Sequence, residues 1–213
     1  MAAAEVYFER QKKKLCLVHS LNALLQRRAF TKAALDHIAS ELKRKAKALD
    51  LPAAAHKSML GNYDVNVLEA ALAEHGLGTI WWDSRRELAV LMAGVPESPR
   101  GGVVLNFRRK RALFGSSRHW ITVTAIDGVW YNLDSKNKVP VAFSSFGDAV
   151  HFVASTALSC DGHVLVVQPA GSGSGSSAST SSSTSSSTDD EEPQTRAPRI
   201  DPSRHMVGSP YPL

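Results

Sequence analysis

Residues 121–134 read Ile121-Thr-Val-Thr-Ala-Ile-Asp-Gly-Val-Trp-Tyr-Asn-Leu-Asp134, and this stretch decides the fold. Two runs rich in β-branched and aromatic residues flank Asp127-Gly128. An Asp-Gly pair between such runs is a strong signal for a hairpin with a two-residue turn. The turn pairs Ile126 with Val129, and the same register places the first residue of the stretch opposite the last. The sequence therefore predicts two antiparallel strands of defined register.

Four of the five predicted helices precede the hairpin, whereas four of the five strand patterns lie at or after residue 103. Apolar spacing and capping residues predict helices over residues 16–26, 32–47, 65–75, 85–93 and 144–158. Strand patterns occur at 79–83, 103–107, 118–126, 129–134 and 163–168. Because helices cluster early and strands late, the order predicts an α+β fold and not an alternating parallel α/β fold.

Composition divides the chain into a folded domain at residues 5–170 and a tail at 171–213. Eleven of the eighteen residues from 171 to 188 are serine, and an acidic cluster and a Pro-rich end follow. Such a segment buries too little apolar surface to offset its ordering entropy. We therefore expect residues 171–213 to be disordered and joined to the domain through a flexible linker.

The charge of the chain is concentrated in the folded part. The whole chain carries a net charge of +5 and residues 171–213 carry −2, so the first 170 residues carry +7. A basic body is compatible with a nucleic acid or an acidic protein partner. Outside the clusters at 43–47 and 108–111 the Lys and Arg residues are scattered, without a stripe of stacking aromatics. We therefore expect no nucleic-acid partner.

Several other classes of protein are also disfavoured by the sequence. It has no run of 18 apolar residues and no apolar signal core, so we expect neither a membrane span nor secretion. The expected compartment is the cytoplasm or the nucleus, where Cys16 and Cys160 are thiols. The six histidines other than His19 and His119 show no ligand spacing with cysteine, and the sequence has no CxxC motif and no glycine-rich phosphate loop. We therefore expect no metal and no cofactor.

Cys16 is the first candidate for chemistry because it opens a predicted helix. The positive end of the helix dipole lowers the pKa of a thiol placed there, and Lys12, Lys13 and Lys14 act in the same direction. The alternative is a small buried residue within the apolar stretch Leu15-Cys16-Leu17-Val18. Cys16 alone does not decide between these two interpretations.

A nucleophilic thiolate needs a base, and that base needs a group that orients it. Two histidines are candidates for the base. His19 lies three residues after Cys16 on the same predicted helix, and His119 lies at the start of a predicted strand. The residue pattern leaves both candidates open.

The hairpin register gives His119 an orienting partner. His119 shares a strand face with Ile121, which the register pairs with Asp134. Asp134 is therefore a diagonal neighbour on the same face, within about 7–8 Å at Cβ. Asn132 lies one step further away, so Asp134 is the better candidate.

Several motifs along the chain match those of a known family. The most specific is Gln-x4-Cys-x2-His-x-Leu-Asn within residues 7–26. It is followed by Lys57-Ser-Met-Leu-Gly-Asn-Tyr-Asp-Val-Asn-Val-Leu, Trp81-Trp-Asp, Arg118-His-Trp-Ile and Tyr131-Asn-Leu-Asp-Ser-Lys. In these motifs and in their order the sequence resembles the Josephin domains, over about residues 5–168. The chain is closest to the small Josephin proteins and not to the long polyglutamine-bearing ataxin-type member.

This resemblance implies a papain-like cysteine protease fold, with a helical N-terminal part packed on a C-terminal antiparallel sheet. It implies a deubiquitinase that acts on ubiquitinated proteins through a thioester. By the motifs, Cys16 is the nucleophile, His119 the base, Asp134 the orienting residue and Gln11 an oxyanion-hole donor. The ataxin-type member is expected to have Asn at the position of Asp134, and Asp is equally able to accept a hydrogen bond from imidazole. The rival interpretation is a catalytically weak or inactive ubiquitin-binding scaffold.

The resemblance also implies where ubiquitin contacts the domain. It assigns substrate contacts to Val65 and Asn66 at a helix opening, and places His75 where the ataxin-type member has a Trp contact. It assigns residues 31–60 to a helical arm that flanks the cleft. For Val65 the alternative is an ordinary core position.

Overall fold

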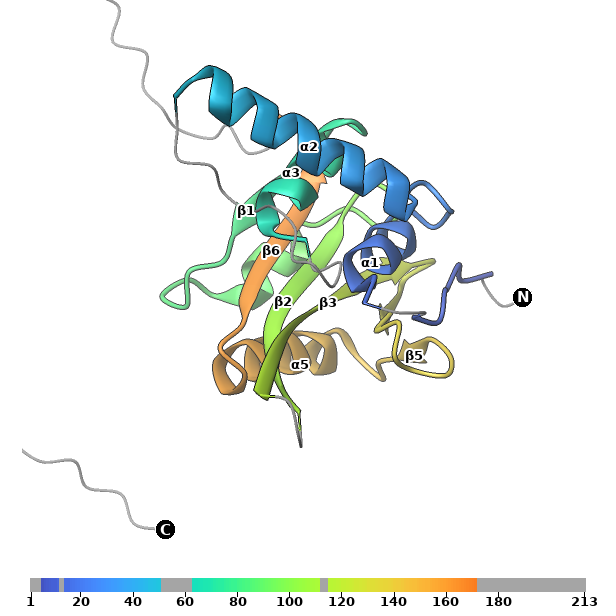
Figure 1. The fold of residues 1–213 in the computed structure, drawn as a ribbon. Helices are drawn as coiled ribbons and strands as arrows, with labels where there is room; N and C mark the ends of the chain where they lie inside the picture. Colours follow the sequence, from blue (N-terminus) through green and yellow to red (C-terminus); the bar gives the residue numbers. More distant parts are fainter. Residues whose placement is uncertain (1–4, 12–13, 51–62, 112–114, 172–213) are drawn as a thin grey trace, which may run out of the picture. The chain divides into compact units, whose positions relative to one another are not determined.

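The computed structural model describes residues 5–11, 14–50, 63–111 and 115–171 (Figure 1). These residues form an α+β domain, as the order of the sequence patterns predicts. The helices are α1 (Cys16–Leu24), α2 (Lys32–Ala48), α3 (Val65–Ala73), α4 (Leu88–Ala93) and α5 (Phe146–Ser159). The strands are β1 (Leu77–Trp81), β2 (Gly102–Arg111), β3 (Gly115–Ile126), β4 (Val129–Asn132), β5 (Val141–Ala142) and β6 (His163–Pro169).

The six strands form one antiparallel sheet in the order β1-β6-β2-β3-β4-β5. The predicted hairpin register is confirmed, because Ile126 pairs with Val129 across the Asp127-Gly128 turn. Both turn residues have positive φ, 49° and 78°, as a two-residue hairpin turn requires. Strand β4 ends at Asn132, two residues before the predicted end, so Asp134 lies in the turn that follows the strand.

Helices cover both faces of the sheet because successive side chains of a strand point to opposite faces. On one face, apolar residues of α1, α2 and α3 pack against alternate strand residues such as Val104, Trp120 and Leu165. On the other face, α4 and α5 pack against the strand residues that come next in the sequence, such as Leu105 after Val104 and Ile121 after Trp120. Figure 1 shows α5 across β2 and β3, away from α1. Strand β3 therefore presents residues to two separate cores.

Two predicted helix starts are confirmed by their caps. The hydroxyl of Thr31 accepts a hydrogen bond from the backbone N–H of Ala34 at 3.2 Å, before α2. The carboxylate of Asp64 accepts one from the backbone N–H of Val67 at 3.2 Å, before α3. Such caps typically contribute about 1 kcal/mol each, because they satisfy N–H groups that the helix leaves unpaired.

Helix α1 is fixed to β3 by a buried pair of hydroxyls. The Ser20 and Thr122 hydroxyl oxygens lie 2.7 Å apart, and the Thr122 hydroxyl also donates to the carbonyl of Ser20 at 2.8 Å. Both residues are at most 1% exposed. This contact sets the position of α1 relative to the strand that carries His119.

Some predictions fall outside the described residues. These are the tail from residue 172 onward, residues 51–60 of the expected helical arm, and Lys12 and Lys13. Within the described part of the chain, none of the helices has the length and apolar character needed to cross a membrane.

Candidate active site

His119 and Asp134 form the best-defined pair in the site. The Nε2 atom of His119 lies 2.7 Å from Oδ1 of Asp134, and the histidine is 2% exposed. The same Asp134 oxygen accepts the backbone N–H of Lys136 at 2.9 Å. The sequence-predicted partner is thus in contact with His119, although it comes from a turn and not from the strand itself.

The charge state of Asp134 determines the tautomer of His119. Burial raises the pKa of Asp134, but the hydrogen bond and charge of His119, the N–H of Lys136 and the charge of Arg109 together hold it below its usual value. An ionised carboxylate only accepts hydrogen bonds, so Nε2 of His119 carries the proton that it donates. In neutral His119, Nδ1 is then the nitrogen that can act as a base.

Asn132 supports this turn without contacting His119 among the described residues. Its side-chain oxygen accepts the backbone N–H of Asp134 at 3.0 Å. The structure therefore places Asp134, and not Asn132, against the imidazole.

Two residues of β2 also contact the pair, and the sequence analysis did not identify them. The ring of Phe107 meets the His119 ring edge-on, with centroids 5.7 Å apart. Arg109 Nη1 lies 3.7 Å from the second oxygen of Asp134. Both contacts follow from the pairing of β2 with β3, a long-range register that no local motif encodes.

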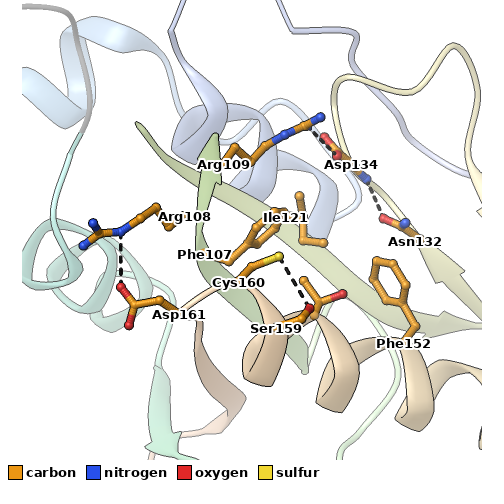
Figure 2. Close-up of a pocket in the computed structure, with 11 residues that line it drawn as sticks. Phe107, Arg108, Arg109, Ile121, Asn132, Asp134, Phe152, Ser159, Cys160 and Asp161 are labelled. Atoms are coloured by element: carbon orange, nitrogen blue, oxygen red, sulfur yellow. Dashed lines mark hydrogen bonds and ion pairs between the residues drawn. The ribbon is translucent and has the colours of Figure 1, made fainter. Parts of the chain in front are cut away.

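A cavity of about 710 Å³ opens beside Asp134, between strands β2 and β3 and helix α5 (Figure 2). Its lining is Phe107, Arg108, Arg109, Ile121, Asn132, Asp134, Phe152, Thr156, Ser159, Cys160 and Asp161. Cys160 lies in this wall next to the hydroxyl of Ser159, 3.6 Å away. None of the described residues that line the cavity is a histidine, so the described lining offers Cys160 no imidazole base.

Cys16 is the first residue of α1, as predicted, but it is 3% exposed. Burial raises the pKa of its thiol, and this outweighs the backbone N–H groups of Trp120 and Leu17 and the charge of Lys136. The expectation of a lowered pKa for Cys16 was therefore wrong. Close packing of α1 buries the thiol, and the cost of burying its charged form outweighs the helix dipole. The contact with Trp120 nevertheless places the sulfur beside the residue that follows His119.

The structure does not join Cys16 directly to His119. Among the described residues, the His119 ring makes its hydrogen bond to Asp134 alone. Catalytic hydrogen bonds are often long without substrate and tighten when it binds. The structure therefore holds a buried Cys16 thiol with a raised pKa and a His119 imidazole whose tautomer is set by Asp134.

The burial of Cys16 predicts that its thiol is alkylated slowly. In a Cys160→Ser background, Cys16 should react with iodoacetamide more slowly at pH 7.5 than a free thiol, because only the thiolate reacts. Since burial raises the pKa of Cys16, the rate should still be rising with pH above about 9. Mass spectrometry of quenched time points measures this profile. A rate that reaches its plateau below pH 7 would contradict the buried neutral thiol.

The second histidine candidate is engaged elsewhere. His19 Nδ1 lies 2.6 Å from a carboxylate oxygen of Glu9, on the segment that precedes α1. Its Nε2 is buried and has no partner among the described residues. The structure therefore pairs His119 with Asp134 and His19 with Glu9.

Gln11 lies against the residue that follows Asp134. Its backbone N–H donates to the carbonyl of Ser135 at 2.6 Å. The hydroxyl of Ser135 donates to the side-chain oxygen of Gln11 at 3.4 Å. This pairing joins residues 124 positions apart and places the side-chain amide of Gln11 at the border of the site.

The three expected ubiquitin-contact residues lie at the two ends of α3. Val65 is half-buried against the first core, and Asn66 beside it is exposed. His75 follows the far end of the helix, where its ring meets Phe30 with centroids 5.1 Å apart. With a rise of about 1.5 Å per residue, the two ends are about 14 Å apart, so these residues do not form one compact patch.

In the described ranges, no group of three His, Cys, Asp or Glu side chains is arranged to hold a metal ion. The chemistry available from the described side chains is that of a thiol, an imidazole, a carboxylate and an amide.

Comparisons with known proteins identify relatives of this domain. The Josephin family model matches residues 11–168. Josephin-2 of Homo sapiens is 41% identical over 157 residues, which cover 70% of this chain and 79% of that protein. A Josephin-like protein of Drosophila melanogaster is 32% identical over 171 residues, 76% of this chain and 73% of the relative. One of Arabidopsis thaliana is 39% identical over 151 residues, 66% of this chain and 41% of the relative.

Proposed function

The chain belongs to the Josephin family of cysteine-protease-like deubiquitinases, and on that premise we propose that it hydrolyses bonds to the C-terminal glycine of ubiquitin. The substrates are isopeptide or peptide bonds in ubiquitinated proteins. The observation that carries the proposal is the buried His119–Asp134 pair at 2.7 Å, beside the α1 terminus that bears Cys16. Activation of a thiol requires a base, and Asp134 holds the His119 imidazole in the tautomer that can act as one.

Acylation begins with proton transfer from the Cys16 thiol to Nδ1 of His119. The sulfur attacks the glycine carbonyl, and the developing oxyanion is stabilised by the Gln11 amide and the backbone N–H of Cys16. One such donor is typically worth about 2.7–4 kcal/mol in the transition state. His119 then gives its proton to the departing lysine amine, and a thioester to ubiquitin remains.

Deacylation reverses these roles. His119 takes a proton from water, the hydroxide attacks the thioester, and the thiol leaves with that proton. Asp134 stays ionised throughout, because it orients the imidazole and stabilises its cationic form.

One observation favours a second candidate, a ubiquitin-binding scaffold without turnover. Cys16 is buried, and its hydrogen bond to His119 is not formed among the described residues. A domain fixed in this state would bind ubiquitin without cleaving it.

A ubiquitin probe with a C-terminal electrophile separates the two candidates. A deubiquitinase should form one covalent adduct at Cys16, seen as a mass increase of the full chain and located by peptide mapping. A Cys160→Ala chain is the matched control, because it retains the nucleophile and should react equally well. Binding without an adduct would favour the scaffold, and an adduct at Cys160 would refute the assignment of the site.

A further inference from the structure

We propose that Glu9 and His19 are positioning residues that hold the Gln11 amide in the oxyanion hole. This inference rests on the proposed function, since it concerns the same site. Neither residue contacts the reacting atoms in the mechanism above. They act through residues 5–11, the strap, which precedes α1.

Glu9 is the anchor of the strap. Its carboxylate accepts hydrogen bonds from His19 Nδ1 at 2.6 Å, from the Asn22 amide at 3.3 Å, and from the Tyr7 hydroxyl. Burial and the carboxylate of Glu9 raise the pKa of Tyr7 to about 12, so the phenol remains a donor at neutral pH. One carboxylate thus joins the strap to two positions on α1.

The partners of Glu9 are themselves fixed in place. The amide of Asn22 is buried, donating to the carbonyl of Phe30 at 3.0 Å and accepting that residue's N–H at 2.7 Å. The side chain of His19 is 12% exposed, and among the described residues the ring has no polar partner except Glu9. Strap and helix are therefore joined through groups that have little freedom to move.

Gln11 follows Glu9 by two residues and is held from its other side by Ser135. The strap therefore spans from the helix that carries Cys16 to the turn that carries Asp134. An oxyanion donor must be held to within about 0.5 Å, and small displacements cost large factors in rate. Fixing Glu9 on α1 therefore sets the distance between the side-chain amide of Gln11 and the backbone N–H of Cys16.

Kinetics on a fluorogenic ubiquitin substrate test this inference in the full chain. Glu9→Gln keeps the shape and loses the charge, and Glu9→Ala removes the anchor. We expect kcat to fall by about 10-fold and about 100-fold, with KM within about twofold of wild type. The control is Glu5→Gln, an exposed glutamate on the same strap, which should leave both constants unchanged.

The histidine is tested by a matched pair of variants. His19→Asn retains a donor near the position of Nδ1 and should remain close to wild type. His19→Leu removes one of the three donors to Glu9 and should cost less than Glu9→Ala, and the double variant should be no worse than Glu9→Ala alone. Additive losses would overturn the idea that the two residues act as one unit.

Two readouts separate positioning from a general loss of structure. Ubiquitin aldehyde forms a thiohemiacetal whose oxygen occupies the oxyanion hole, so its affinity should fall by the same factor as kcat/KM. Melting temperature and Cys16 alkylation should change little in Glu9→Gln. A lower kcat with unchanged aldehyde affinity, or a lower melting temperature with unchanged kcat, would overturn the inference.

A third readout does not depend on activity. The backbone N–H of Gln11 donates to Ser135, so its hydrogen exchange should accelerate in Glu9→Ala and not in Glu5→Gln. Unchanged exchange overturns the inference even where the wild type cleaves ubiquitin. Failure of the wild type to cleave ubiquitin instead rejects the proposed function.

Discussion

Replacing Cys16 with Ala is expected to abolish ubiquitin cleavage, reducing kcat/KM by at least about 10⁴-fold, because no other group can form the thioester. The side chain is buried at the start of α1, and loss of one sulfur atom leaves a small cavity. The fold should therefore survive, with a melting temperature within a few degrees of wild type. Hydrolysis of a fluorogenic ubiquitin substrate and thermal unfolding measure the two effects.

The matched control for this variant is Cys160→Ala. Cys160 is the only other cysteine in the sequence, and it lines the cavity beside α5, whose described lining residues include no histidine. It should retain full activity. Activity that survives in Cys16→Ala and is lost in Cys160→Ala would show that Cys160, on the other side of the sheet, is the nucleophile.

The second large effect is expected for Asp134→Ala, with a fall of about 100-fold in kcat. Removing the carboxylate frees the His119 ring to adopt the other tautomer and leaves the imidazolium of the transition state unpaired. Asp134→Asn should recover much of this loss, because an amide oxygen still accepts the Nε2 proton. Asn132→Ala should cost less than Asp134→Ala, since the side chain of Asn132 accepts the backbone N–H of Asp134 and makes no described hydrogen bond to His119.

These three variants are compared by kcat at saturating ubiquitin substrate and by the pH profile of kcat/KM. The pKa of Asp134 is held below its usual value, so the carboxylate is ionised above about pH 4 and lost as a partner only below that range. Asp134→Asn should therefore leave the profile above pH 5 similar in shape. A larger loss in Asn132→Ala than in Asp134→Ala would show that the wrong residue has been assigned as orienter.

The hairpin was predictable because its information is local. The Asp127-Gly128 turn fixes the register of two adjacent strands, and that register brings His119 and Asp134 together across only 15 positions. The starts of α2 and α3 were predictable for the same reason, since their caps, Thr31 and Asp64, each contact a backbone N–H three residues away.

Features that depend on long-range packing were not predictable from the sequence. The burial of Cys16, which reverses the expected direction of its pKa shift, depends on how closely α1 packs against β3. The Gln11–Ser135 contact spans 124 residues and has no local signature. Strand β2 extends beyond its predicted end at 107 into the basic run at 108–111, where no apolar alternation marks a strand. Strand β3 begins at Gly115, three residues before its predicted start at 118.

The buried, neutral thiol of Cys16 also determines how the protein withstands oxidants. Peroxide attacks thiolates far faster than thiols, and it converts them first to sulfenic acid and then to irreversible sulfinic and sulfonic acids. A thiol that is 3% exposed and has a raised pKa is protected from this sequence of reactions. On the proposed mechanism, Cys16 would be open to oxidation only while a substrate occupies the site and His119 holds the thiol proton.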